Sequence, residues 1–184
     1  IVGLTTLLPS CVQGDFSDLY DEELVWSNGI PRTKSGTDPG QSYDMPQCGV
    51  SCIAYITGHS TDQIVGYAAN CDINCGPTDQ ALKGSQIVTI FGAIGEDYPN
   101  SWIGIDYTID GVTVENRSPM QERLNSLMDG TINIIVNLRR SHYVVGVQIF
   151  TSTNNQRYIR TYDPQTKKYA NYSITSRDIT GAIL

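Results

Sequence analysis

Long apolar runs, basic residues and nucleotide-binding loops are missing or scarce in this sequence of 184 residues. No run approaches the ~18 consecutive apolar residues that a membrane-spanning helix needs, so we expect no membrane span. Lys and Arg number 12 against 19 Asp and Glu, a net charge of −7, which argues against nucleic acid as the main partner. Neither a Gly-x-x-x-x-Gly-Lys-Ser/Thr loop nor a Gly-x-Gly-x-x-Gly turn occurs, so a nucleotide cofactor lacks its usual cradle.

The composition that is present indicates a folded domain. Hydrophobic residues make up 40% of the chain and charged residues 17%, whereas a disordered chain is poorer in the first and richer in the second. The length suits a single domain with a real hydrophobic core. No repeat or linker divides the chain, and nothing in the pattern indicates an oligomeric state.

Histidine and cysteine are few, which limits the metal sites that the chain could build. The two histidines are His59 and His142, and the five cysteines are Cys11, Cys48, Cys52, Cys71 and Cys75. The pairs Cys48-x3-Cys52 and Cys71-x3-Cys75 make a four-thiolate zinc site conceivable. Cys52 lies in an apolar stretch, however, and there it is better interpreted as a small core residue. Cys71 and Cys75 could instead form a disulfide or remain free thiols.

The first part of the chain differs from the rest. Residues 1–40 are predicted to be an N-terminal extension with a long loop region rich in Gly, Pro, Asp and Ser, and residues 41–184 the domain proper. Leu8-Pro9-Ser10-Cys11 resembles the end of a bacterial lipoprotein signal, although a first β-strand with an ordinary cysteine fits as well. The composition favours a bacterial cell-envelope or secreted protein, with a cytoplasmic location as the alternative.

Hydrophobic periodicity predicts an α+β fold in which N-terminal helices pack on a C-terminal antiparallel sheet. Cap residues and helical spacing predict helices over residues 50–56, 61–69, 77–91 and 119–128. Alternation and turn residues predict strands over 102–109, 112–114, 131–138, 143–150 and 158–162, with a weak one at the C-terminus.

Three residues with catalytic chemistry occur at suggestive places in these elements. Cys48 precedes an apolar helix, where the helix dipole favours a thiolate, and Gly49 would let the backbone approach a substrate. His142 opens one strand and Asp163 closes the next. If the two strands form a hairpin, Asp163 stands beside His142, and the three residues match a nucleophile, a general base and an orienting carboxylate.

Each of these residues also has an ordinary structural explanation. A cysteine at a helix start is more often structural than catalytic, and Asp163-Pro164 after a strand is often only a turn. A fold kept as a non-catalytic binding module is therefore a second hypothesis, with late tyrosines forming a recognition surface. Cys75-Gly76 is a weaker candidate for the nucleophile.

The segment from Gln47 to Ile56 (QCGVSCIAYI) resembles the nucleophile segment of the papain-like peptidases that cleave double-glycine leaders from bacteriocins, and of their stand-alone relatives. His142-Tyr143-Val144-Val145 is similar to the histidine motif of that family, and Asp163-Pro164 to its aspartate motif. The resemblance covers roughly residues 41–168.

The resemblance implies a papain-like fold, no metal or organic cofactor, and a peptide or protein as substrate. It gives Cys48 the role of nucleophile, His142 that of general base and Asp163 that of orienting group. The family places an oxyanion-binding Gln six residues before the nucleophile, where this sequence has Ser42. Gln41 lies one residue further back and is the candidate donor, with Gln47 as the alternative. The same residues would also support an amidase, a deamidase or a transglutaminase.

Overall fold

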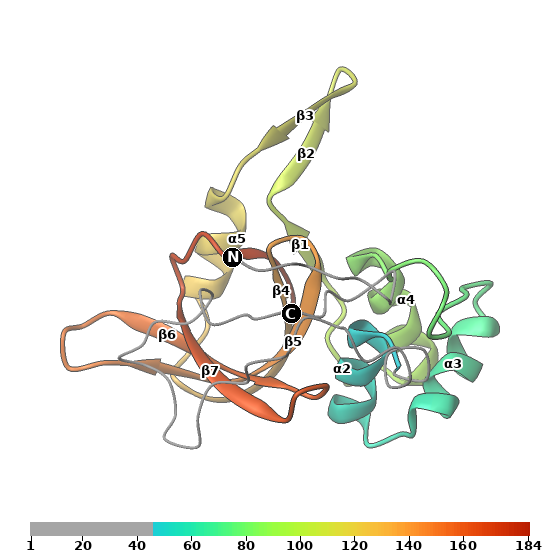
Figure 1. The fold of residues 1–184 in the computed structure, drawn as a ribbon. Helices are drawn as coiled ribbons and strands as arrows, with labels where there is room; N and C mark the ends of the chain where they lie inside the picture. Colours follow the sequence, from blue (N-terminus) through green and yellow to red (C-terminus); the bar gives the residue numbers. More distant parts are fainter. Residues whose placement is uncertain (1–45) are drawn as a thin grey trace, which may run out of the picture.

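The computed structural model describes residues 46–184. Helices come first and a six-stranded antiparallel sheet follows, so the predicted α+β class is confirmed (Figure 1). The predicted extension over residues 1–40, Cys11 and Gln41 lie outside the described residues. Within residues 46–184, no helix has both the length and the apolar character needed to cross a membrane.

The first two helices form where their cap residues predict. The helix α2 (Cys48–Thr57) ends at Gly58, whose φ of 73° is left-handed and easiest for glycine. The helix α3 (Thr61–Ala69) begins with a capping box. In it the Ser60 hydroxyl accepts from the Gln63 N–H, and the Gln63 side chain accepts from the Ser60 N–H.

The prediction of a third helix from residue 77 is wrong in its start, since α4 spans Gly84–Ile94. The Gln47 side-chain amide donates to the carbonyl oxygens of Gly76, Asp79 and Gln80, at 2.9, 3.1 and 3.0 Å. These bonds hold residues 76–80 as a loop against α2, and the helix begins only after it. The short-range pattern could not reveal a partner about thirty residues away in the chain.

The main sheet has the strand order β1-β8-β4-β5-β6-β7. Its strands are β1 (Trp102–Gly104), β4 (Gly130–Leu138), β5 (His142–Thr151), β6 (Arg157–Asp163), β7 (Lys168–Ser173) and β8 (Ile179–Ile183). Two predictions need correction. The C-terminal region holds two strands rather than one weak strand. The predicted strand over 102–109 is broken, because β1 pairs with β8 while β2 (Asp106–Ile109) pairs with β3 (Val112–Glu115). The helix α5 (Ser118–Asn125) follows that hairpin.

The sheet carries a hydrophobic core on each face. Helices α2, α3 and α4 gather on one side of it, whereas α5 lies away from them beside the β2–β3 hairpin (Figure 1). Ile135 belongs to the core under α2–α4, and its neighbours Ile134 and Val136 belong to the core that includes Met120 and Leu124 of α5. This alternation makes the second half of β4, residues 134–138, buried on both faces. The sheet is thereby held from both sides, and α2 packs on it against the strand β5.

Two glycines give a stringent test of how α4 packs on the sheet. A Cβ atom added at Gly84 would lie 2.1 Å from Trp102 Cδ2, whereas one added at Gly66 in α3 would meet nothing within 4 Å. We expect Gly84→Ala to lower the free energy of unfolding by about 1–3 kcal/mol through overpacking. Gly66→Ala should raise it by about 0.5–1 kcal/mol, because alanine favours a helix interior. Urea unfolding of both variants measures the difference, and equal effects would contradict this packing.

Candidate active site

The end of one strand and the start of its neighbour bring His142 and Asp163 together. Strands β5 and β6 pair antiparallel, with Val145 opposite Tyr162, so His142 at the start of β5 lies near Asp163 at the end of β6. The His142 Nε2 and Asp163 Oδ2 atoms are 2.8 Å apart. The two residues are only 3% and 5% exposed. The predicted juxtaposition of this histidine and this aspartate is therefore confirmed.

The turn after β6 fixes the Asp163 carboxylate. Its second oxygen, Oδ1, accepts hydrogen bonds from the backbone N–H groups of Gln165 at 2.9 Å and Thr166 at 3.4 Å. Burial alone would raise the pKa of Asp163, but the charge and hydrogen bond of His142, together with these N–H groups, hold the pKa below its ordinary value. An ionised carboxylate only accepts, so Nε2 of His142 carries the donated proton. Exchange of a proton with a thiol would then use Nδ1.

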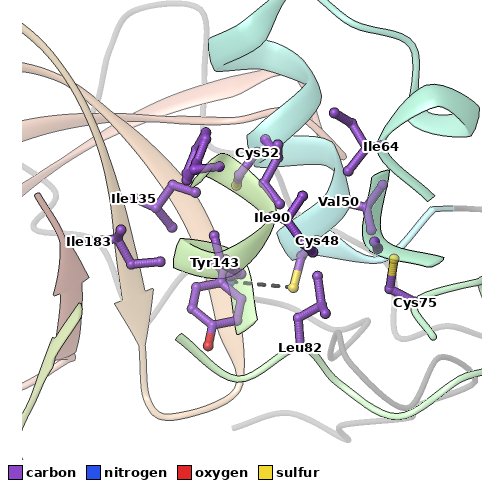
Figure 2. Packing of buried hydrophobic residues seen from close by; sticks show 14 of the residues in the cluster. Cys48, Val50, Cys52, Ile64, Cys75, Leu82, Ile90, Ile135, Tyr143 and Ile183 are labelled. Carbon is purple, nitrogen blue, oxygen red and sulfur yellow. Dashed lines mark hydrogen bonds between the residues drawn. The ribbon is translucent and has the colours of Figure 1, made fainter. Parts of the chain in front are cut away.

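Cys48 lies at the first position of α2, against the strand that begins with His142. The backbone N–H of Tyr143, the residue next to His142, donates to the Cys48 sulfur over 3.4 Å (Figure 2). Cys48 is 1% exposed and disulfide-bonded in this structure. The structure therefore shows the Cys48 sulfur oxidised and buried. The sulfur can act as a nucleophile only after the disulfide is reduced.

Two of the other cysteines of residues 46–184, Cys52 and Cys75, do not resemble activated thiols. Cys52, Cys71 and Cys75 are free. Burial, followed by the charge of Asp163, raises the pKa of Cys52, and burial with the nearby Asp79 raises the pKa of Cys75 to about 11. Both shifts oppose thiolate formation, which weakens the alternative nucleophile at Cys75.

The conceivable four-cysteine zinc site is not assembled. Within residues 46–184, no group of three or more His, Cys, Asp or Glu residues is placed to hold a metal ion.

Gln47 is already used by the fold, which removes it as the alternative oxyanion donor. Its amide nitrogen donates to three backbone carbonyls of the loop before α4, and the residue is fully buried. Gln41, the first candidate, lies outside the described residues. The role expected for Gly49 in substrate approach stays a prediction. A Cβ there would lie 3.3 Å from side-chain atoms of Leu82 and Ile87, so this glycine permits close packing inside the molecule.

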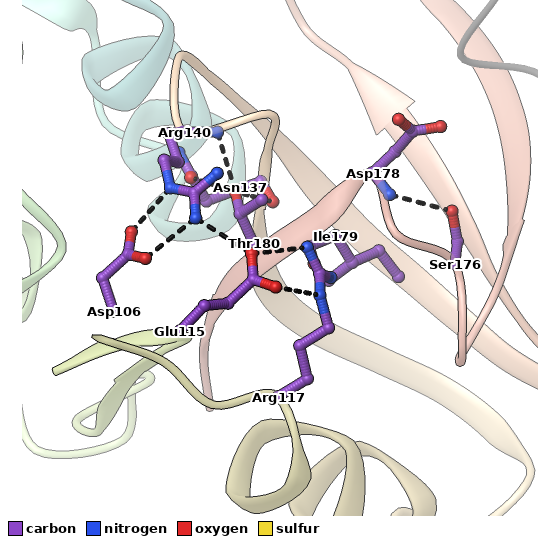
Figure 3. Close-up of polar contacts among 9 residues, drawn as sticks. All are labelled: Asp106, Glu115, Arg117, Asn137, Arg140, Ser176, Asp178, Ile179 and Thr180. Carbon is purple, nitrogen blue, oxygen red and sulfur yellow. Dashed lines mark hydrogen bonds and ion pairs between the residues drawn. The ribbon is translucent and has the colours of Figure 1, made fainter. Parts of the chain in front are cut away.

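The turn that leads into His142 is strained and clamped, a feature that sequence patterns did not indicate. Arg139 and Arg140 have φ angles of 49° and 60°, which non-glycine residues adopt at a cost. The Arg140 guanidinium donates to the two Asp106 carboxylate oxygens at 2.6 and 2.8 Å, and to Glu115 at 3.0 Å (Figure 3). These contacts tie the β2–β3 hairpin to the turn. In the sequence, only the pair Arg139-Arg140 could have drawn attention to this turn.

The same turn is also held from β8. The Arg140 N–H donates to the Thr180 hydroxyl at 2.8 Å, and this hydroxyl donates to Asn137 Oδ1 at 2.7 Å (Figure 3). The Asn137 amide in turn reaches the carbonyl oxygen of His142 at 3.5 Å. The start of β5, and with it the imidazole, is therefore positioned by contacts from two neighbouring elements.

A pocket of about 380 Å³ opens next to the segments that carry Cys48 and Asp163. It lies between the α2 side and the loop after β6, and its lining comprises Pro46, Ser51, Tyr55, Thr61, Tyr162, Pro164 and Gln165. The rings of Tyr55 and Tyr162 approach each other with centroids 4.8 Å apart. None of the lining residues that fall within 46–184 carries a formal charge, so this part of the wall suits an uncharged group.

The cysteine environments predict an order of thiol reactivity in the reduced protein. Cys48 should react with iodoacetamide at neutral pH faster than Cys52 and Cys75, since burial and nearby carboxylates hold those two protonated. Peptide mapping by mass spectrometry over a time course measures the order. Equal labelling of Cys48 and Cys52 would contradict an activated Cys48.

The Asp163 carboxylate should make stability sensitive to acid. Because its folded pKa is lowered, its contribution is present above the ordinary value of 3.8 and is lost as the pH falls through the folded value. We expect Asp163→Asn to lower the free energy of unfolding by about 1–2 kcal/mol at pH 7, since a neutral hydrogen bond replaces a charge-assisted one. The variant should also lose part of the acid sensitivity. Urea unfolding from pH 7 downward tests this, with exposed Asp97→Asn as the control; an unchanged pH dependence would be the contrary result.

Comparison of the chain with protein-family models, with curated proteins and with solved structures found no match. The resemblance to the leader peptidases therefore stays a prediction from short motifs. The function is inferred below from the geometry around His142, Asp163 and Cys48.

Proposed function

We propose that the reduced protein is a papain-like cysteine peptidase that cleaves peptide bonds through an acyl-enzyme. The observation that carries the proposal is the buried bond between His142 Nε2 and Asp163 Oδ2 at 2.8 Å, together with a cysteine at a helix N-terminus whose sulfur accepts the N–H of the residue after His142. A neutral imidazole oriented by a carboxylate is the general base that a thiol nucleophile requires. The layered α+β architecture supports the papain-like assignment.

In the proposed reaction Cys48 passes its proton to Nδ1 of His142, and the thiolate attacks the scissile carbonyl carbon. The C–N bond breaks as the imidazolium returns the proton to the leaving amine, which leaves a thioester on Cys48. Water then attacks the thioester, with His142 again taking the proton. The C–S bond breaks, the carboxylic acid product departs, and the proton returns to the Cys48 sulfur. Asp163 keeps the ring in the required tautomer throughout.

Stabilisation of the oxyanion is assigned to backbone N–H groups at the start of α2. The first N–H groups of a helix have no acceptor within it, and the N-terminal dipole favours negative charge. Gln41 is the proposed side-chain donor, as the family resemblance implies. Gln47 does not contribute, because its amide is bonded to the loop before α4.

The leaving group decides between closely related reactions. Amidase and deamidase chemistry would release ammonia or a small amine, and a transglutaminase would pass the acyl group to a second amine. The described residues of the pocket wall carry no formal charge, which favours an uncharged side chain in any of these substrates and does not discriminate between them.

The test uses the full chain with dithiothreitol and a positional library of fluorogenic peptide amides. We expect cleavage by the reduced wild-type protein, no cleavage without reductant, and a loss of at least about 10³-fold in Cys48→Ala and in His142→Ala. Cys71→Ala, which changes a free cysteine elsewhere, should cleave at the wild-type rate. Cleavage that persists in Cys48→Ala would overturn the proposed nucleophile.

A second candidate, a non-catalytic binding module on the same fold, is favoured by the state of Cys48. Its sulfur is disulfide-bonded and the residue is buried. Disulfides persist in oxidising compartments, where a nucleophile held in this way would stay inactive. If the reduced protein neither cleaves the library nor reacts with a peptidyl chloromethyl ketone, this second function replaces the first.

A further inference from the structure

Gln165 makes two contacts that join the helical side of the site to the sheet side. Its backbone N–H donates to Asp163 Oδ1 at 2.9 Å. Its side-chain amide donates to the Pro46 carbonyl oxygen at 2.8 Å, across 119 positions of the sequence. Pro46 lies two residues before Cys48. One residue therefore bonds both the orienting carboxylate and the segment that delivers the nucleophile.

We infer that Gln165 is a positioning residue, whose side-chain amide holds the Asp163 turn against the Cys48 segment and so sets how the imidazole meets the sulfur. This inference rests on the proposed peptidase function. Strand pairing fixes His142 and Asp163 relative to each other, because β5 and β6 are neighbours in one sheet. Cys48 belongs to α2, which packs on the sheet without backbone pairing.

The contacts across that interface explain why one amide can matter. The Cys48 sulfur accepts the Tyr143 N–H at 3.4 Å, a long bond to a soft acceptor. The Gln165 bond to Pro46 is shorter and is made by two groups without formal charge, so it does not depend on pH. A displacement of about 1 Å at reacting atoms can cost on the order of a hundredfold in rate. The Gln165 amide prevents such a displacement.

The position of Gln165 in the pocket wall requires a test that separates positioning from substrate binding. Gln165 lines the pocket with Pro46 and Pro164, so its loss could alter substrate affinity instead. A positioning role predicts a fall in kcat with KM nearly unchanged. A binding role predicts a rise in KM.

The variant Gln165→Met keeps the length of the side chain and removes the donor. Measured in the reduced full chain, we expect its kcat to fall about ten- to a hundredfold with KM within about twofold of wild type. Gln165→Lys, which restores a donor of similar reach, should recover most of the loss. Gln121→Met on α5, away from the site, is the matched control and should behave as wild type. A kcat of Gln165→Met equal to that of the control, or a change confined to KM, overturns the inference.

A second readout does not require turnover. The proton that His142 Nε2 shares with Asp163 should give a far-downfield proton NMR signal in the folded protein, assigned by its loss in His142→Ala. In Gln165→Met, release of the turn should weaken the bond from the Gln165 N–H to Asp163 Oδ1, so we expect this signal to shift or broaden without disappearing, and in Gln165→Lys to return. If wild type cleaves nothing while the signal still responds in this way, the peptidase proposal fails and the positioning role stands. An unchanged signal in Gln165→Met overturns the positioning role.

Discussion

The candidate site depends on one buried hydrogen bond, between the imidazole at the start of β5 and the carboxylate at the end of β6. Antiparallel pairing places those two strand ends side by side, so the fold itself produces the contact. A buried carboxylate is costly unless it is compensated, and here the histidine and two backbone N–H groups of the following turn compensate it. The same bond that stabilises Asp163 fixes the tautomer and orientation of His142.

Everything around the pair restricts its movement. The turn before His142 adopts φ angles that arginine would ordinarily avoid, and ion pairs join that turn to the β2–β3 hairpin. On the other side, Gln165 connects the Asp163 turn to the segment before Cys48. The strained turn and the exposed hairpin have no evident purpose in packing the core. Both become understandable as supports for a histidine that must hold one orientation.

Local sequence signals predicted the parts of the fold that local chemistry decides. Gly58 and the Ser60–Gln63 box marked helix ends correctly, and strand alternation with the hairpin argument placed His142 beside Asp163. Contacts between distant residues were invisible to such signals. The Gln47 amide bonds the carbonyls of Gly76, Asp79 and Gln80 in the loop before α4, and the Gln165 amide bonds Pro46 across 119 positions of the sequence. The disulfide at Cys48 was likewise undetermined, because five cysteines allow many pairings.

The central claim is that the imidazole of His142 ionises the Cys48 sulfur once the protein is reduced. The most direct measurement is the pH dependence of iodoacetamide reaction at Cys48, in the reduced wild-type protein and in His142→Ala. The account predicts a reactive plateau in wild type that extends about two pH units below the range of an ordinary thiol, and its loss in the variant. Identical pH curves for the two proteins would contradict it.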